Sequence, residues 1–528
     1  MILQTPPITL ELDEIRDLAK SCARKFKIPS DAIVACQLIK KSLDVRHKHP
    51  RFQVILQMHI VDDARMTQKL RDAGCIDPIP MPELPRFKRV QNQPRICIVG
   101  AGPSGLFAAM TFAAAGFSVD IFERGKMVKQ RAQDIGALIN GAKLNPESNI
   151  CFGEGGAGTY SDGKLMTRTK SREIPIIMDW FVQFGAKECI RYEAHPHIGT
   201  DCLMPILVKM REYLEAHGTK YYFGHRIDDF LMDDDRCRGI VVNQNRLDYD
   251  IVLLCVGHSA DGIFETLHRR GVQIEPKPFA VGVRVEHPQA LINEIQYGTY
   301  ANHPLLPAAE YAVRFNHETL PSAFSFCMCP GGRIVASQTT EDTRVVNGMS
   351  SSLRNGNYAN SAIVVQATPE MFEPGPLGGL HWIRNLERKA SVNCPPAFAP
   401  AQSMMDFLHH RASTQNPHTT YKPGTVPCNL HDILPPQICA SLEAAFPVFN
   451  NQMRGFISSE ANLVGIESRT SSPLRIVRDD QFCAIGTKGL YPLGEGAGYA
   501  GGITSCALDG MHAALHLLNQ FGAVESNS

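Results

Sequence analysis

The stretch of residues 94–123 constrains the fold of this chain more than any other, because it combines two apolar strands, a glycine-rich turn and a helix. The first strand is expected at 95–99, an apolar run typical of buried parallel sheets. The turn at 100–105 reads GAGPSG, and an alanine-rich helix is expected from 106 to 115. A second strand is expected at 117–122. This succession predicts the βαβ start of a Rossmann-like nucleotide-binding domain.

Each of the three glycines of the turn is expected to be required for a different steric reason. Gly100 permits the tight turn, Gly102 lets a phosphate approach the backbone without meeting a Cβ, and Gly105 lets the helix lie close to the strand. The phosphate is expected at the N-terminus of the helix, beside Pro103 and Ser104, because free N–H groups and the helix dipole attract an anion there. The turn is therefore predicted to bind a dinucleotide. The alternative is a glycine-rich turn that only packs a helix on a sheet.

An acidic residue, Glu123, follows the second strand, 18 residues after Gly105. This is near the spacing of roughly 20 residues expected for the acid that accepts the ribose hydroxyls. The GxGxxG pattern also occurs at 153–158 and 496–501, but neither copy has the complete set of strand, helix, second strand and acid. Only the first copy is predicted to be a dinucleotide site.

The composition bounds the class of protein. The 528 residues predict two to four domains, and 53 basic residues balance 53 acidic ones, so no global charge would draw the protein to nucleic acid or to an anionic membrane. The first residues lack the pattern of a signal peptide, and no run approaches the 18 apolar residues of a membrane span. The 16 cysteines contain no CxxC pair, which favours reduced thiols. A cytoplasmic protein is expected.

Residues 1–76 are expected to form a small α+β domain, and the proline-rich segment 77–93 a semi-rigid linker. The expected elements of the small domain are strands at 8–12 and 52–61 and helices at 13–26 and 31–39. A basic patch at 40–51 is a candidate contact for RNA or an acidic partner, but a solvated turn is the favoured interpretation.

The rest of the chain is expected to form one nucleotide-binding domain interrupted by an insertion. Residues 94–275 are expected to form the first part of the nucleotide-binding domain, and residues 276–455 an inserted β-rich substrate domain. Residues 456–528 are expected to complete the nucleotide-binding domain as its C-terminal closure, with a strand near 490 and a helix at 503–518.

A glycine-rich loop at 147–165 contains Gly155, Gly156 and Gly158. So many glycines cannot form a stable helix or strand, and something is therefore expected to approach this backbone closely. A second phosphate or cofactor contact is the favoured interpretation, and a glycine-rich surface loop is the alternative.

Seven further motifs accompany the βαβ start: LNPESNICFGEGGAGTYSDGKL, PHIGTD, KPFAVGVRVEHPQ, SFCMCPGG, NGMS, ESRTSSPLRI and GLYPLGEGAGYAGGI. With them, the chain resembles the bacterial family of FAD-dependent, or NAD(FAD)-utilizing, dehydrogenases, flavoproteins of the glutathione-reductase-type FAD-binding fold. The resemblance runs over nearly the whole chain. It implies an α/β fold in which a Rossmann-like FAD/NAD(P)-binding domain carries an inserted β-rich substrate domain and a small N-terminal α+β domain.

The resemblance implies that the dinucleotide is FAD. By that analogy Arg124 and Arg131 flank the adenosine diphosphate, and Glu495 accepts hydrogen bonds from the ribityl chain. The helix that begins at 501–503 would aim its N–H groups at the N1/C2=O edge of the flavin. The cofactor-binding residues predicted in these ways are Gly100, Gly102, Pro103, Ser104, Gly105, Glu123, Arg124, Arg131, Gly155, Gly156, Gly158, Gly494, Glu495, Gly501, Gly502 and Ile503.

Flavin chemistry implies an oxidoreductase that moves two electrons between FAD and a small molecule, with NAD(P)H as a candidate transient donor. A flavin-dependent monooxygenase and a non-enzymatic FAD-containing binding protein are the alternatives. Lys164 is a candidate charge near the flavin or a partner of a neighbouring acid, and Cys327 and Cys329 are candidates for a thiol relay or for positions in a strand turn. No histidine has the setting of a metal motif, so no metal site is predicted.

Overall fold

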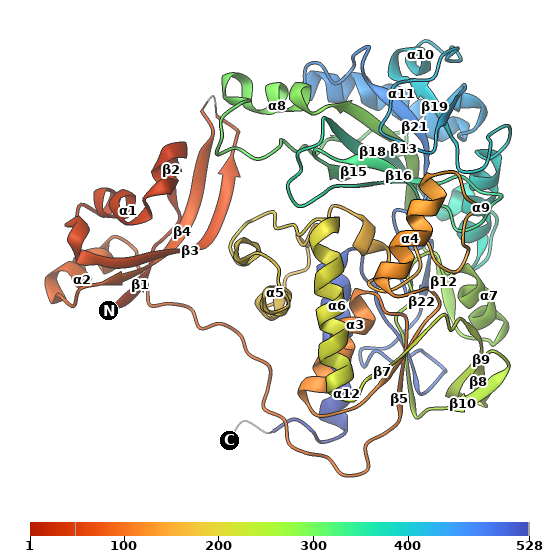
Figure 1. Cartoon of the computed structure of the whole chain (residues 1–528), viewed down its shortest axis with the longest axis horizontal. Coiled ribbons are helices and arrows are strands. Elements are labelled where there is room, and N and C mark those ends of the chain that lie inside the picture. The colour runs from red at the N-terminus through yellow and green to blue at the C-terminus, as the bar shows by residue number, and fades with distance from the viewer. Residues whose placement is uncertain (48, 526–528) are drawn as a thin grey trace.

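The computed structural model describes residues 1–47 and 49–525. Figure 1 shows a small N-terminal unit, coloured red, beside a larger body, and an extended orange segment that joins them. The body contains two large sheets with helices packed around them. Within the described ranges, every helix is too short or too polar to span a lipid bilayer.

The N-terminal unit packs two helices on an antiparallel sheet in which β4 pairs with the other three strands. Its strands are β1 (Ile2–Gln4), β2 (Ile8–Glu11), β3 (Ile33–Asp44) and β4 (Arg51–Ile60), and its helices are α1 (Leu18–Phe26) and α2 (Ala64–Asp72). Along β4, buried residues alternate with more exposed ones, so one face of the sheet forms the core of the unit.

The helix predicted at 31–39 is wrong, because only a short 3-10 turn, Ser30–Ala32, precedes the long strand β3. β3 pairs with β4 along almost its entire length, and this pairing outweighs a short helical pattern in the sequence. The helix predicted at 13–26 is interrupted at Asp17. The Asp17 side chain accepts a hydrogen bond from the Lys20 N–H at 3.0 Å and caps the start of α1.

A five-stranded parallel sheet forms the first half of the body, in the order β23-β11-β5-β6-β7. Its strands are β5 (Ile96–Val99), β6 (Asp120–Glu123), β7 (Lys220–Phe223), β11 (Ile251–Leu254) and β23 (Leu490–Pro492). The helices of this half are α3 (Pro103–Ala114), α4 (Val128–Ile139), α5 (Ile174–Gln183), α6 (Thr200–Ala216), α7 (Asp261–Arg269) and α12 (Ile503–Gln520). The Rossmann-like fold predicted from the glycine-rich turn is confirmed.

The two ends of this half meet in the packing of α3 against α12 (Figure 1). A Cβ at Gly510 would lie 2.0 Å from the backbone oxygen of Ser104, so only glycine allows the two helices to approach so closely. β23 likewise joins the edge of β11, which puts the last strand of the chain in the sheet that begins with β5.

A seven-stranded sheet forms the second half of the body, in the order β14-β15-β18-β13-β21-β19-β20. Its strands are β13 (Phe279–Pro288), β14 (Arg314–Phe315), β15 (Ala323–Cys329), β18 (Tyr358–Ala367), β19 (Ala399–Ser403), β20 (Thr425–Pro427) and β21 (Asn462–Glu467). Its helices are α8 (Gln289–Tyr297), α9 (Gly378–Lys389), α10 (Met404–Leu408) and α11 (Pro436–Gln452). The sheet extends beyond residue 455, where the insertion was expected to end, because the fully buried β21 pairs with β13 and β19.

Smaller strand groups complete the body. They are the meander β8 (Ile227–Asp233), β9 (Arg236–Val242) and β10 (Asn245–Asp248), the pair β12 (Ile274–Pro276) and β22 (Leu474–Ile476), and the pair β16 (Arg333–Ala336) and β17 (Val346–Met349).

The linker 77–93 contains no helix or strand, yet the body holds it. The Lys88 N–H donates to Ala523 O at 2.9 Å, so the linker lies along the C-terminal segment. The N-terminal unit contacts the body through β3, where Nζ of Lys41 lies 3.1 Å from Oε1 of Glu193. One lysine of the basic patch is therefore part of an internal contact.

Candidate functional site

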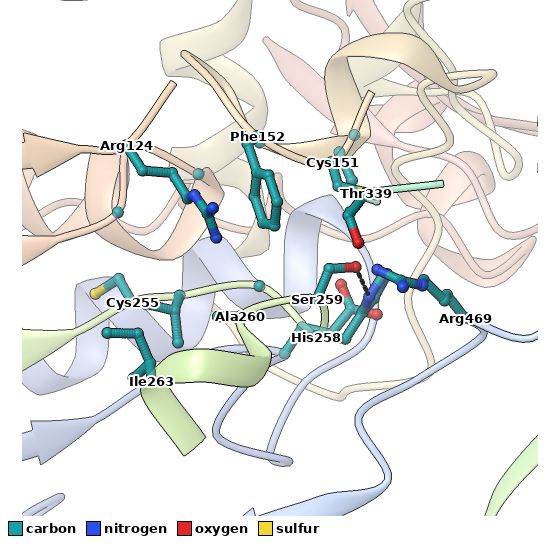
Figure 2. Close-up of a pocket in the computed structure, with 18 of the residues that line it drawn as sticks. Arg124, Cys151, Phe152, Cys255, His258, Ser259, Ala260, Ile263, Thr339 and Arg469 are labelled. Atoms are coloured by element: carbon teal, nitrogen blue, oxygen red, sulfur yellow. Dashed lines mark hydrogen bonds between the residues drawn. The ribbon is translucent and has the colours of Figure 1, made fainter. Parts of the chain in front are cut away.

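A cavity of about 990 Å³ is lined by residues from both halves of the body. This volume is at the upper end of the range of roughly 300–1,000 Å³ that ligand pockets occupy. Its wall combines the turn 100–105, the end of β6, the glycine-rich loop, the segment after β11, parts of β15 and β17 and the start of α12. Figure 2 shows Arg124 and Phe152 on one side and His258 and Ser259 across from them. The cavity lies where the carboxyl ends of parallel strands usually hold a nucleotide.

The glycines of the turn 100–105 differ in what surrounds them. A Cβ at Gly100 would lie 2.6 Å from Cys255 O, and one at Gly105 would lie 2.1 Å from Gly100 O, so both are needed for backbone packing. A Cβ at Gly102 would meet nothing closer than the Cα of Gly156, at 3.9 Å. The backbone of Gly102 therefore faces open space in the cavity wall, as a phosphate-binding residue requires.

The first turn of α3 has no side-chain cap at Gly102, and Pro103 occupies its first position. Pro103 and Ser104 both line the cavity, and the Ser104 hydroxyl lies 3.7 Å from Sγ of Cys255. The N–H groups at this helix end are therefore available to a ligand rather than to a capping side chain.

Glu123 lines the cavity at the end of β6, and its carboxylate already accepts backbone hydrogen bonds. Oε2 accepts from Ala101 N at 3.0 Å, while Oε1 accepts from Gly125 N at 2.8 Å and from Gly153 N at 2.9 Å. Glu123 thus ties the turn to the glycine-rich loop, a role that the sequence did not predict. A carboxylate offers about four acceptor sites, so Glu123 retains capacity for a sugar hydroxyl.

Arg131 does not line the cavity, which corrects the expectation that it flanks a bound nucleotide. It is fully buried, and three of its nitrogens donate to backbone oxygens of the glycine-rich loop. The acceptors are Asn149 O at 2.8 Å, Ile150 O at 2.7 Å and Glu154 O at 2.7 Å. Burial lowers the pKa of the guanidinium, and these bonds compensate its lost hydration. Arg131 therefore shapes the loop rather than contacting a ligand.

Within the glycine-rich loop, Gly156 and Gly158 line the cavity, but Gly155 does not. The Gly155 N–H donates to Ala101 O at 2.9 Å, and its φ of 83° lies in the left-handed region. A Cβ at Gly158 would lie 3.1 Å from Cγ1 of Ile503. The loop therefore packs between the turn 100–105 and the start of α12.

Arg124 lines the cavity beside Phe152 (Figure 2). Its guanidinium carbon lies 3.8 Å from the centre of the Phe152 ring, and its Nε donates to Oε2 of Glu147 at 2.9 Å. Stacking and the ion pair hold the guanidinium in one orientation at the wall.

The start of α12 opens on the same cavity. Gly501, Gly502 and Ile503 line it, Gly502 has no capping side chain, and a Cβ at Gly501 would meet nothing within 4 Å. Glu495 also lines the cavity. Burial raises the pKa of Glu495 to about 7, although the positive charge of Lys277 lowers it. Gly494 does not reach the wall, because its N–H donates to Oδ2 of Asp509 at 2.7 Å and its backbone packs on Ser104.

The wall from the second sheet contains Cys327 and Cys329, both free thiols. Cys327 is exposed and Cys329 is buried, and burial raises the pKa of the Cys329 thiol. A thiol with a raised pKa is a poor nucleophile, so a relay that needs both thiols is disfavoured. Buried Arg284 donates to Cys327 O from behind the wall, which favours the structural interpretation.

Lys164 lines the cavity within a network of charges, so the predicted pairing with a neighbouring acid is present. Its Nζ lies 3.0 Å from Oδ2 of Asp162 and 3.1 Å from Oε2 of Glu310. Arg354 pairs with Asp162 behind it, and His195 bonds to Glu310. Burial opposes the charge on Lys164, but the two carboxylates raise its pKa.

Among the cavity residues that the sequence analysis did not name are His258 and Arg469. Burial, followed by the charge of Arg469, lowers the pKa of His258 to about 4, so this imidazole is neutral at pH 7 and bonds to the Ser259 hydroxyl at 2.8 Å. Arg469 pairs with buried Glu387 through two contacts, at 2.8 and 2.7 Å. Two sequence features could have indicated these residues. His258 lies in the GHS that follows the strand at 251–254, and Arg469 lies in the ESRTSSPLRI motif.

The wall fits the FAD that the sequence resemblance implies. The N-termini of α3 and α12 both open on the cavity without side-chain caps, and Gly102 and Gly501 leave space there. Such helix ends favour anions. The pyrophosphate of FAD could face the uncapped end of α3, and the N1/C2=O edge of the flavin could face the uncapped end of α12.

Sequence comparisons support the same cofactor. A family described as “FAD-dependent protein, C-terminal domain-like” matches residues 278–470, and a “NAD(P)-binding Rossmann-like domain” matches residues 98–135. An uncharacterised protein of Clostridium beijerinckii is 35% identical over 533 residues, which cover 99% of this chain and 99% of that protein.

Two solved structures are similar in part. CtdE in complex with FAD is 12% identical, with a TM-score of 0.31 over 81% of this chain and 87% of its own. The glycerol-3-phosphate dehydrogenase of Bacillus halodurans complexed with FAD is 10% identical, with a TM-score of 0.35 over 83% of this chain and 67% of its own.

Proposed function

Because this chain belongs to the family of FAD-dependent oxidoreductases, we propose that its cavity holds FAD along the carboxyl edge of the five-stranded sheet. A small-molecule substrate would then lie against the second sheet. The observation that carries this proposal is the pair of uncapped helix N-termini, α3 and α12, on one cavity.

The adenosine half would lie along β5 and β6. Gly102 leaves room for the pyrophosphate at the start of α3, Glu123 offers its remaining acceptor sites to the ribose, and the stacked guanidinium of Arg124 stands beside the phosphates. Arg131 and Gly155 act indirectly, because they hold the shape of the glycine-rich loop.

The flavin half would lie between the glycine-rich loop and the start of α12. When bound, FAD supplies two-electron redox chemistry. The N–H groups at Gly502 and Ile503 would favour negative charge at the flavin edge that faces them, and Glu495 would accept hydrogen bonds from the ribityl hydroxyls.

The substrate side would be the wall from β15 and β17, and Lys164 is one of the cations that line the cavity. We place NAD(P)H among the electron donors that bind transiently there. We also retain the glutathione-reductase-type subclass, the domain boundaries at 76, 93 and 275, and a cytoplasmic location as proposals that extend the family assignment. We place the end of the insertion after β21 rather than at 455, because β21 completes its sheet.

The test is an anaerobic titration of the purified protein with NADH, NADPH and a panel of metabolites, read as bleaching of the flavin absorbance. The cofactor released by denaturation should be FAD, and one class of small molecule should bleach it. Purified protein that takes up no FAD on reconstitution would overturn the proposal. An oxygenated product formed in step with NAD(P)H consumption would identify the monooxygenase alternative instead.

A further inference from the structure

Three metal-ligating side chains meet on the second half of the body, outside the cavity. His410 follows α10, His431 lies in the 3-10 turn Leu430–Asp432, and Glu443 lies in α11. One ligand atom from each residue lies within 4.8 Å of the other two. Figure 1 shows α10 and α11 in the upper part of the body, far from the five-stranded sheet. None of the three residues lines the cavity.

The three side chains converge on one carboxylate oxygen. Oε1 of Glu443 lies 2.6 Å from Nε2 of His431 and 3.6 Å from Nε2 of His410. The two imidazole rings lie side by side, with centres 4.6 Å apart. Two nitrogens and one oxygen are thus turned toward the same small volume.

The two ring nitrogens of His431 have different oxygen partners. Its Nδ1 lies 3.0 Å from Oδ1 of Asn429, an oxygen that also accepts from the His431 backbone N–H at 3.3 Å. Both ring nitrogens of His431 therefore face oxygen acceptors, whereas a neutral imidazole donates from only one nitrogen. Nε2 is the ring nitrogen turned toward Glu443 and His410, so it is the atom that a metal ion would contact. With a metal on Nε2, the Nδ1–H donates to Asn429, which is the usual arrangement around a metal-binding histidine.

Of the three ligands, His431 packs on the core, Glu443 is half-buried and His410 faces solvent. The His431 ring stacks on buried Phe407, with centres 4.4 Å apart, and its side chain is 18% exposed. The His410 side chain is 64% exposed, on a backbone with φ of 54°. Donor atoms bound to one tetrahedral zinc ion lie about 3–4 Å apart, so metal binding brings the exposed His410 closer and separates Nε2 of His431 from Oε1 of Glu443.

We propose that His410, His431 and Glu443 bind a divalent transition-metal ion of the zinc class, with water in the remaining position. Two imidazoles and one carboxylate are a ligand set that Zn²⁺ accepts, whereas Mg²⁺ and Ca²⁺ prefer oxygen ligands alone. The ion would join the segment after α10, the 3-10 turn and α11. The sequence predicted no metal site, because no HExxH or CxxC spacing links these residues. The proposal does not depend on FAD or on the reaction.

The experiment compares zinc binding by the full-length protein and by matched variants. Wild type, His410→Ala, Glu443→Gln and His409→Ala are treated with a chelator and titrated with Zn²⁺ against a zinc indicator. His409 is the control, because it is exposed, precedes His410 and bonds through its ring to Met405 O at 2.6 Å. The 16 cysteines are the same in all four proteins, so any zinc bound by thiols cancels in the comparison.

Wild type and His409→Ala should bind one equivalent of Zn²⁺ more than His410→Ala or Glu443→Gln, and Zn²⁺ should raise the melting temperature of the first two only. Mg²⁺ should not raise the melting temperature of any of the four proteins. Asn429→Ala should weaken the site by about 10–100-fold, the usual effect of removing such a partner. Equal zinc stoichiometry and affinity in all four proteins, or an equal loss in His409→Ala, would overturn the proposal. Circular dichroism establishes that each variant is folded before it is compared.

Discussion

The substitution Gly102→Val tests the cofactor site most directly, because the structure separates its effect on binding from its effect on folding. The backbone of Gly102, with φ of −81° and ψ of −178°, suits any residue, and a Cβ there meets no atom within 3.8 Å. The variant should therefore fold. Its side chain would occupy the space in which the pyrophosphate is proposed to lie.

The expected loss follows from the hydrogen bonds that the phosphate can no longer make. A hydrogen bond to a charged group contributes about 1.5–3 kcal/mol, so displacement from two backbone N–H groups costs about 3–6 kcal/mol. FAD affinity should fall by about 10²–10⁴-fold. The assay is flavin absorbance per chain after gel filtration, followed by titration of the apoprotein with FAD.

Two further glycine variants serve as controls for this prediction. Gly136→Ala adds a methyl group in α4, where a Cβ meets nothing within 4 Å, and should leave FAD binding unchanged while stabilising the helix by about 0.5–1 kcal/mol. Gly105→Ala should lower the melting temperature of the apoprotein itself, because its Cβ would lie 2.1 Å from Gly100 O. A Gly102→Val protein with full FAD occupancy and unchanged affinity would refute the assignment of the phosphate site.

Three other predictions concern charged residues. Arg131→Leu should destabilise the apoprotein by about 3–5 kcal/mol in a denaturant titration, because it leaves buried loop carbonyls without donors, and equal stability would show that the loop does not need this support. In the folded apoprotein Glu495 holds a proton up to a pKa of about 7, above its ordinary 4.5, so its contribution to stability should decrease as the pH rises through that window. The melting temperature of Glu495→Gln should fall less than that of wild type between these pH values, and parallel pH profiles would contradict this reasoning. The variant Lys164→Met should retain FAD, but the midpoint potential of the flavin should fall by roughly 30 mV in a spectroscopic redox titration, because a cation near the reduced flavin is lost. An unchanged potential would show that Lys164 lies too far from the flavin to affect it.

The sequence predicted the elements whose patterns are local. The glycine-rich turn, its flanking strand and helix, and the C-terminal helix from Ile503 are all found where their patterns indicate. The strand β3 was predicted as a helix, because a short apolar pattern does not reveal that β4 will pair with it.

Side-chain roles were harder to predict, because they depend on residues distant in the sequence. The pattern around Arg131 gives no sign that the carbonyls of the loop fold around its guanidinium. Lys164 meets Glu310 only after the second sheet is in place. His431 and Glu443 likewise become neighbours only through the packing of α11.

The pairing of β23 with β11 and of α12 with α3 has a consequence for synthesis of the protein on the ribosome. The sheet that begins at Ile96 cannot be finished until Leu490–Pro492 has left the exit tunnel, and α12 follows later still. Until then, the apolar face of α3 that receives α12 is uncovered, and the nascent chain needs protection from aggregation. The complete cavity therefore forms only after α12 has left the exit tunnel, and a chain that stops before Ile503 lacks one wall of the site.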